Sequence, residues 1–150
     1  MKKELRLGDI LVERSLISEG DLARALEEQK RTREFLGLIL LKRSLIKEKD
    51  LLKALSEQLN IPFISLQYRY MHWDFIKGFN QSLILDYKCF PVERDDHSIT
   101  IAITNPLDAW VIGKAEEEVM PYRLKLALVT RDDMEKAILR YKEYVQQKYF

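Results

Sequence analysis

Apolar residues recur at helical spacing over the first 60 residues, and the same pattern occurs twice. When residues 35–58 are placed on residues 6–29, at a period of 29, 15 of the 24 positions are identical. In the first copy Leu7, Ile10 and Leu11 share one helical face, and a second apolar face follows a short bend. Each copy therefore predicts two helices, and the repetition predicts one supersecondary unit used twice.

The bend in each copy carries the signals of a helix end and a helix start. The first helix is predicted to end near Ser15, and Ser18-x-x-Asp21 resembles a capping box with aspartate in place of glutamate. A second helix should therefore begin near Glu19. Its shared face falls at i, i+3, i+4 and i+7 in both copies: Leu22, Ala25, Leu26 and Gln29, then Leu51, Ala54, Leu55 and Gln58.

The periodicity changes after Pro62, which ends the fourth helix because proline cannot continue it. The stretch 98–104 has the β-branched alternation of a half-buried strand. We predict, in chain order, strands over 88–93 and 98–104, a helix from the turn at 105–108 to about Val119, a strand over 122–129 and a helix over 130–147. In the last helix Met134, Ile138, Tyr141 and Val145 are predicted to face inward.

These elements predict an α+β protein in three parts. Tandem helical hairpins, a four-helix repeat unit, occupy residues 1–60, and residues 61–72 are a connector. A small ββαβα subdomain occupies residues 73–150, with a helical crossover between its last two strands.

Composition narrows the class of protein. The chain has 150 residues, 47% hydrophobic and 33% charged, which is typical of a globular protein. The formal net charge of +1 does not favour nucleic acid as a partner. One cysteine, Cys89, points to a reducing compartment. No apolar run approaches the roughly 20 residues of a membrane span, so we expect a cytoplasmic protein without direct membrane insertion.

The sequence offers little for catalysis. A P-loop needs a glycine five residues before its Gly-Lys, and Gly113-Lys114 has Asp108 at that position. Neither His72 nor His97 has a second ligand at metal spacing. We therefore predict a protein that is not an enzyme, with no catalytic residues, no metal and no cofactor.

The doubled pattern reads RLGxx-apolar-apolar…LxxxLxxQ, with a five-residue gap before the second copy. It resembles the MshEN domain, the N-terminal region of the assembly ATPases of type II secretion and type IV pili. The later stretches IPFISL, YKCFPVERDDHSITIAITNPLD and KLALVTRDDMEKAILRYKEY resemble the C-terminal part of the same family. The resemblance covers nearly the whole chain, and it implies binding of cyclic di-GMP, with one motif copy gripping each half of the nucleotide.

The resemblance suggests how the repeated residues would meet such a ligand. Backbone N–H groups near a glycine can approach a phosphate, although helix–helix contact would explain the same glycines. The leucines would offer an apolar surface to purine rings or belong to the core, and the glutamine amides would bond a base edge or be solvated. The residues predicted to bind the ligand are Arg6, Leu7, Gly8, Leu22, Leu26, Gln29, Leu36, Gly37, Leu51, Leu55, Gln58 and Asp108.

Two of these residues carry charge. Arg6 can bond guanine O6 and N7 as a fork or pair with phosphate, or it is a surface cation. Asp108 could accept hydrogen bonds from a guanine edge, but we expect it to cap the next helix.

The chain departs from the family pattern at three positions. Phe35 begins the second copy where the family often has arginine, so that half lacks a cation and its ring could stack on a base instead. Ser15 and Ser44 stand where each motif usually has glycine, and serine would be strained there if φ is positive.

Two functional hypotheses follow. In the first, the chain is a cytoplasmic regulatory module that binds cyclic di-GMP across its repeats. In the second, it is a docking adaptor without nucleotide binding, which recruits a secretion or pilus ATPase to an inner-membrane platform protein. In either case it would lie at the membrane only through that partner.

Overall fold

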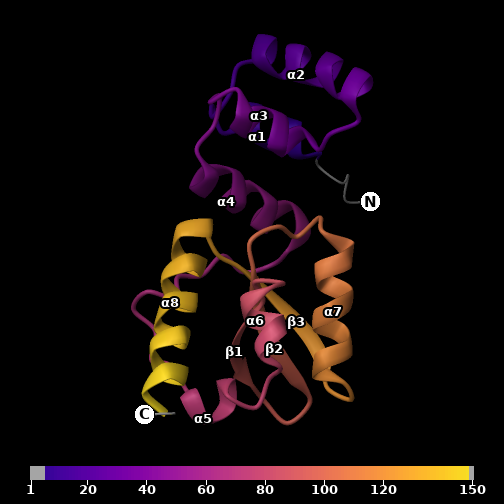
Figure 1. Ribbon diagram of the computed structural model, residues 1–150. Helices are drawn as coiled ribbons and strands as arrows, with labels where there is room; N and C mark the ends of the chain where they lie inside the picture. Colours follow the sequence, from indigo (N-terminus) through magenta and orange to yellow (C-terminus); the bar gives the residue numbers. More distant parts are fainter. Residues whose placement is uncertain (1–5, 149–150) are drawn as a thin grey trace. The chain divides into compact units, whose positions relative to one another are not determined.

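The computed structural model describes residues 6–148 and divides the chain into two compact units, residues 1–60 and residues 61–150 (Figure 1). The first unit is helical, and the second follows the order ββαβα with two additional short helices before its first strand. The predicted α+β class and element order are therefore confirmed. Within residues 6–148 no helix combines the length and the apolar character that crossing a membrane requires.

The first unit consists of four helices that interlock. They are α1 (Leu7–Glu13), α2 (Glu19–Thr32), α3 (Leu36–Lys42) and α4 (Glu48–Leu59). Figure 1 shows α2 and α4 on opposite sides of α1 and α3. Helix α1 packs against α4, and α2 packs against α3, so the first helix of each repeat contacts the second helix of the other. The two repeats therefore form one four-helix body.

Matched apolar positions supply the core of this unit. Ile10 and Leu11 of α1 are buried, and so are their counterparts Ile39 and Leu40 of α3. Ile17 and Ile46, in the bends, are buried as well. The repeated apolar pattern is thus retained because both copies bury the same face.

Each bend is a Schellman motif, in which one residue with left-handed backbone ends the helix. Ser15 has φ 57° and Ser44 has φ 56°. In the first copy the Ser15 N–H donates to the Val12 carbonyl, and the Leu16 N–H donates to the Leu11 carbonyl, both at 2.9 Å. The second copy repeats both bonds. The condition under which we expected strained serines, a positive φ, is therefore met at both positions.

The second helix of each repeat begins where predicted, at Glu19 and at Glu48. The Ser18 hydroxyl oxygen accepts a hydrogen bond from the Asp21 N–H at 3.0 Å, which confirms the N-cap. In the second copy Lys47 takes the position of Ser18, and α4 has no side-chain cap. Only the first copy thus has this stabilising bond.

The second unit contains a three-stranded sheet in the order β1-β2-β3. Strand β1 (Phe90–Arg94) pairs antiparallel with β2 (Ser98–Ile103), and β2 pairs parallel with β3 (Arg123–Leu128). Helix α7 (Ala109–Val119) makes the crossover that a parallel pair requires. Helix α8 (Arg131–Lys148) is the last element of the described residues.

Two short helices lie between the connector and the sheet and were not predicted. They are α5 (Trp73–Ile76) and α6 (Gln81–Leu85). The Asn80 side-chain oxygen caps α6 by accepting from the Ser82 N–H at 2.9 Å. Segments of four and five residues are too short to show a helical period, which explains why the pattern missed them.

Residues of the predicted connector extend the sheet at β3. The Leu128 N–H donates to the Pro62 carbonyl at 2.7 Å, and the Ile64 N–H donates to the Leu128 carbonyl at 2.9 Å. The Asp133 carboxylate in α8 accepts from the Leu66 N–H at 2.6 Å. This segment is therefore held to both β3 and α8.

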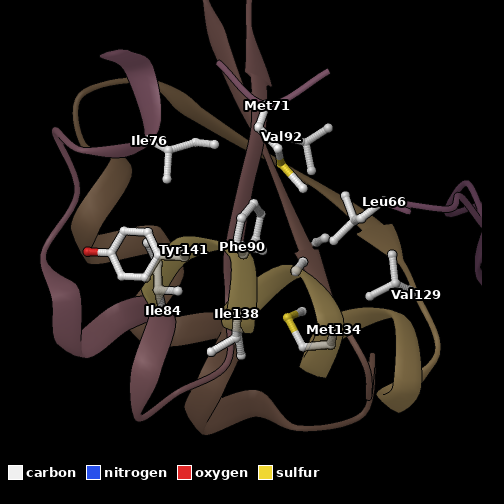
Figure 2. Packing of buried hydrophobic residues seen from close by; sticks show 12 residues of the cluster. Leu66, Met71, Ile76, Ile84, Phe90, Val92, Val129, Met134, Ile138 and Tyr141 are labelled. Atoms are coloured by element: carbon white, nitrogen blue, oxygen red, sulfur yellow. The ribbon is translucent and has the colours of Figure 1, made fainter. Parts of the chain in front are cut away.

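The core of the second unit gathers around Phe90, which is fully buried (Figure 2). Figure 2 shows two residues of α8, Ile138 and Tyr141, beside Phe90. Ile84 of α6 lies next to them. One cluster of this core contains twelve buried residues: Leu66, Met71, Ile76, Ile84, Phe90, Val92, Ala102, Val129, Met134, Ala137, Ile138 and Tyr141. The inward positions predicted for the last helix are confirmed, with Val145 partly buried against the same cluster.

Asp95 organises the turn between β1 and β2. Its carboxylate accepts from the N–H groups of His97 (2.8 Å) and Ser98 (2.7 Å) and from the Ser98 hydroxyl (2.8 Å). These bonds, with the backbone N–H of His97 as the main cause, hold the pKa of Asp95 well below its usual range. The turn thus has a specific carboxylate at its centre.

Candidate functional site

The first helices of the two repeats begin alike in geometry but differ in chemistry. Arg6 is the N-cap of α1 with φ −74° and ψ 151°, and Phe35 is the N-cap of α3 with φ −63° and ψ 138°. Both side chains are exposed, Phe35 to 51%. The same backbone position therefore offers a cation in one half and an aromatic ring in the other.

The two glycines allow close contact between the helices of each repeat. A Cβ added at Gly8 would lie 2.7 Å from Leu22 Cδ1, and one added at Gly37 would lie 3.0 Å from Leu51 Cδ1. Both glycines are buried and have negative φ. Helix contact, one of the two explanations considered for them, is thus present in the structure.

The predicted leucines divide between core and surface. Leu7, Leu51 and Leu55 are buried, whereas Leu22 and Leu36 are half-buried. Leu26 is 39% exposed, whereas Leu55, its counterpart in the second repeat, is buried. Three of these six leucines therefore belong to the core, and Leu26 is the most accessible of the six.

The two glutamines also differ. The Gln29 side-chain NH₂ donates to the Glu34 carbonyl at 3.1 Å and so holds the linker between the repeats. Gln58, at the matched position of α4, is exposed. One amide has a structural partner within the protein, and the other faces solvent.

Asp108 lies in the second unit and caps α7. Its carboxylate accepts from the Val111 N–H at 3.2 Å, which confirms the capping role that we expected. Burial raises the pKa of the nearby Cys89 thiol to about 12, and the Asp108 carboxylate acts in the same direction. Cys89 is therefore a buried thiol in its neutral form.

Two ion pairs cross between the repeats, and neither was predicted from the sequence. Arg14 Nη2 lies 2.7 Å and 2.6 Å from the two carboxylate oxygens of Glu57. Arg43 Nε lies 3.2 Å from each carboxylate oxygen of Glu28, and Arg43 Nη2 also donates to Glu28. A signal was present, because all four residues are among the repeated identities.

Hydrogen bonding from Arg43 lowers the pKa of Glu28, and the same bond raises the pKa of Arg43. Both groups of this pair are therefore charged at neutral pH.

An open pocket of about 490 Å³ lies at the second bend, lined by Leu16, Leu41, Ser44, Leu45, Ile46, Lys47 and Asp50. None of the predicted ligand residues is in that lining. Among residues 6–148 no group of three His, Cys, Asp or Glu side chains is placed to hold a metal ion.

Known protein families and solved structures include several that are similar to this chain. A family model described as the MshEN domain matches residues 59–147. A solved structure described as MshE with cdg is similar to the chain at a TM-score of 0.79 and 26% identity, covering 91% of this chain and 99% of that one.

Two crystal forms of the N-terminal domain of XpsE also share the fold. They match at TM-scores of 0.66 and 0.54, each at 22% identity and over 93% of this chain, covering 98% and 99% of those chains. A search of curated protein sequences finds no match.

Proposed function

The chain belongs to the MshEN domain family, and on that basis we propose that it is a regulatory module that binds cyclic di-GMP across its two N-terminal repeats. We propose further that it works within a type II secretion or type IV pilus system. There it would respond to the nucleotide by changing how it docks on an assembly ATPase or on an inner-membrane platform protein. A ligand shifts such an equilibrium only through different affinities for the two arrangements.

The observation that carries this proposal is the similarity to MshE with cdg, the abbreviation of cyclic di-GMP, over 91% of the chain at 26% identity. The duplication supports it, because cyclic di-GMP consists of two identical halves and the chain offers two copies of one motif. Matched positions such as Gly8 and Gly37 would then meet matched parts of the ligand.

The chain's residues would act in distinct ways. Arg6 is exposed at the start of α1, where its guanidinium can donate two parallel hydrogen bonds to phosphate or guanine. Leu26 is the leucine most accessible to a purine ring. Gln58 is exposed, whereas Gln29 would have to exchange its bond to the Glu34 carbonyl for one to the ligand.

Calorimetric titration of the 150-residue chain with cyclic di-GMP tests the proposal. The wild type should release or absorb heat with a stoichiometry of one nucleotide per chain, and Arg6→Ala should weaken affinity by about tenfold or more. Lys53→Ala is the matched control, because Lys53 is an exposed cation of α4 in the same unit. It should bind as the wild type does.

A docking adaptor without nucleotide binding is the second candidate. Phe35, the N-cap of α3, and Leu38, within α3, are exposed apolar residues where the first repeat has Arg6 and Asp9. Exposed apolar side chains of this kind favour a protein partner. An absence of heat from the wild type at high micromolar nucleotide would contradict nucleotide binding and leave this candidate.

A further inference from the structure

The two ion pairs that cross between the repeats are related by the duplication. In each, an arginine at the end of one repeat's first helix meets a glutamate of the other repeat's second helix. Arg14 and Arg43 are 29 positions apart, and so are Glu28 and Glu57. The pairing is reciprocal, as expected for a unit with approximate two-fold symmetry.

A gain in folding stability does not explain why both repeats have such a pair. The side chains of Arg14 and Glu57 are 59% and 45% exposed, and those of Arg43 and Glu28 are 56% and 18% exposed. Ion pairs at the surface contribute little free energy of folding. Both pairs nevertheless have a defined geometry. Arg43 contacts the Glu28 carboxylate through Nε and Nη2 of its planar guanidinium, and Arg14 contacts both oxygens of Glu57 through Nη2.

The location of the pairs indicates what that geometry fixes. Each arginine directly precedes the left-handed serine of its own bend, and each glutamate directly precedes the repeated glutamine. Each pair therefore joins the bend of one repeat to the glutamine-bearing end of the other. A twist or slide of one repeat against the other would have to break both.

We propose that Arg14–Glu57 and Arg43–Glu28 are positioning residues, a pair of clasps that hold the two repeats in register and so set the spacing of the two half-sites for the ligand. This inference rests on the proposed binding of cyclic di-GMP across the repeats. A ligand that contacts both halves at once binds best when their separation is fixed beforehand, because less freedom is lost on binding.

The experiment compares three sets of variants by calorimetry with cyclic di-GMP. Glu57→Gln and Glu28→Gln each open one clasp, and the double variant opens both. Arg14→Glu combined with Glu57→Arg rebuilds one clasp with its charges exchanged. Glu27→Gln is the control, since it removes the same charge from an exposed position of α2. Thermal unfolding verifies that each variant is folded.

A second measurement does not depend on the ligand. Nitroxide labels at Ala23→Cys in α2 and Lys53→Cys in α4, in a Cys89→Ser background, report the distance between the repeats by pulsed electron paramagnetic resonance. Both labelled positions are exposed. The distribution of distances should broaden when both clasps are opened and should not change with Glu27→Gln.

The expected result is a loss of affinity of about threefold for one open clasp and about tenfold for both, with recovery in the charge exchange. Wild-type affinity in the double variant, or failure of the charge exchange to recover affinity, would overturn the inference. If the wild type itself does not bind, the proposed function fails. The clasps are then judged by distance alone, with broadening in support and an unchanged distribution against them.

Discussion

Ser15 and Ser44 hold the left-handed backbone that turns the chain from the first to the second helix of each repeat. An L-residue other than glycine is strained in this region because its Cβ approaches the backbone. Both positions could be identified from the sequence, because the family pattern has glycine there. The sign of φ could not be predicted, since only the folded bend determines it.

Replacing either serine by glycine should therefore stabilise the protein. We expect Ser15→Gly and Ser44→Gly each to raise the free energy of unfolding by about 0.5–1 kcal/mol, measured by urea denaturation of the 150-residue chain. Ser18→Gly is the control, because Ser18 has φ −84° and caps α2. It should leave stability equal or lower, and an equal gain at all three serines would contradict the strain.

Gly8 illustrates how packing can outweigh helix propensity. Alanine normally stabilises a helix by about 1 kcal/mol relative to glycine, yet a Cβ at Gly8 would press on Leu22. Gly8→Ala should therefore lower the free energy of unfolding, by about 1 kcal/mol after both effects are combined. Gly20→Ala, where the nearest atoms lie 3.8 Å away, should raise it. Urea denaturation that ranks Gly8→Ala above Gly20→Ala would refute this account of the contact.

The turn between β1 and β2 depends on the charge of Asp95. Because folding lowers its pKa, the folded state holds the carboxylate more strongly than the unfolded chain does. The stabilisation is present in full above the ordinary pKa of aspartate, about 4, and is lost as the pH falls toward the folded value. Lys125, 3.5 Å from the carboxylate, adds to the same effect.

Asp95→Asn should thus destabilise the protein at pH 7, and the difference from wild type should shrink as the pH falls below about 4. Thermal unfolding across pH 2.5–7 measures both. Asp96→Asn removes the same charge from the next residue and should show no such convergence. A wild-type advantage that is independent of pH would exclude the charge of Asp95 as its cause.

Elements long enough to show a repeating apolar pattern were predicted from the sequence. Very short helices and the pairing between helices were not. The strand predicted at 98–104 is β2, and the helix predicted at 130–147 is α8. Both could be predicted because alternation and helical spacing persist over enough residues to be recognised. The helices α5 and α6 have four and five residues and carry no period. The pairing of α1 with α4 was also beyond prediction, since repetition shows that two units are alike but not which helix meets which.

Across the whole helical unit, the duplication has retained geometry more closely than chemistry. The clasps and both bends recur in the two repeats, whereas the position of Arg6 in the first repeat is occupied by Phe35 in the second. Most candidate residues could be named from the sequence because they repeat within the pattern that resembles the family, whereas Arg6 and Asp108 have no repeated counterpart. Their differences, such as the engaged Gln29 and the exposed Gln58, depend on the linker and required the structure.

Restoring the missing cation tests how this asymmetry affects binding. Phe35→Arg places a guanidinium at the start of α3 and should tighten the affinity for cyclic di-GMP by about threefold to tenfold in calorimetry. Phe35→Leu is the comparison, because it removes the ring without adding charge. Weaker binding in both variants would mean that the Phe35 ring itself contacts the ligand.

The central claim is that one symmetric nucleotide engages both repeats of the same chain. A nuclear magnetic resonance titration with cyclic di-GMP, which follows the backbone amides of Gly8 and Gly37, tests it most directly. We predict that both signals shift together and saturate at one nucleotide per chain. If one signal moves alone, or if neither moves while the protein remains folded, the claim is contradicted.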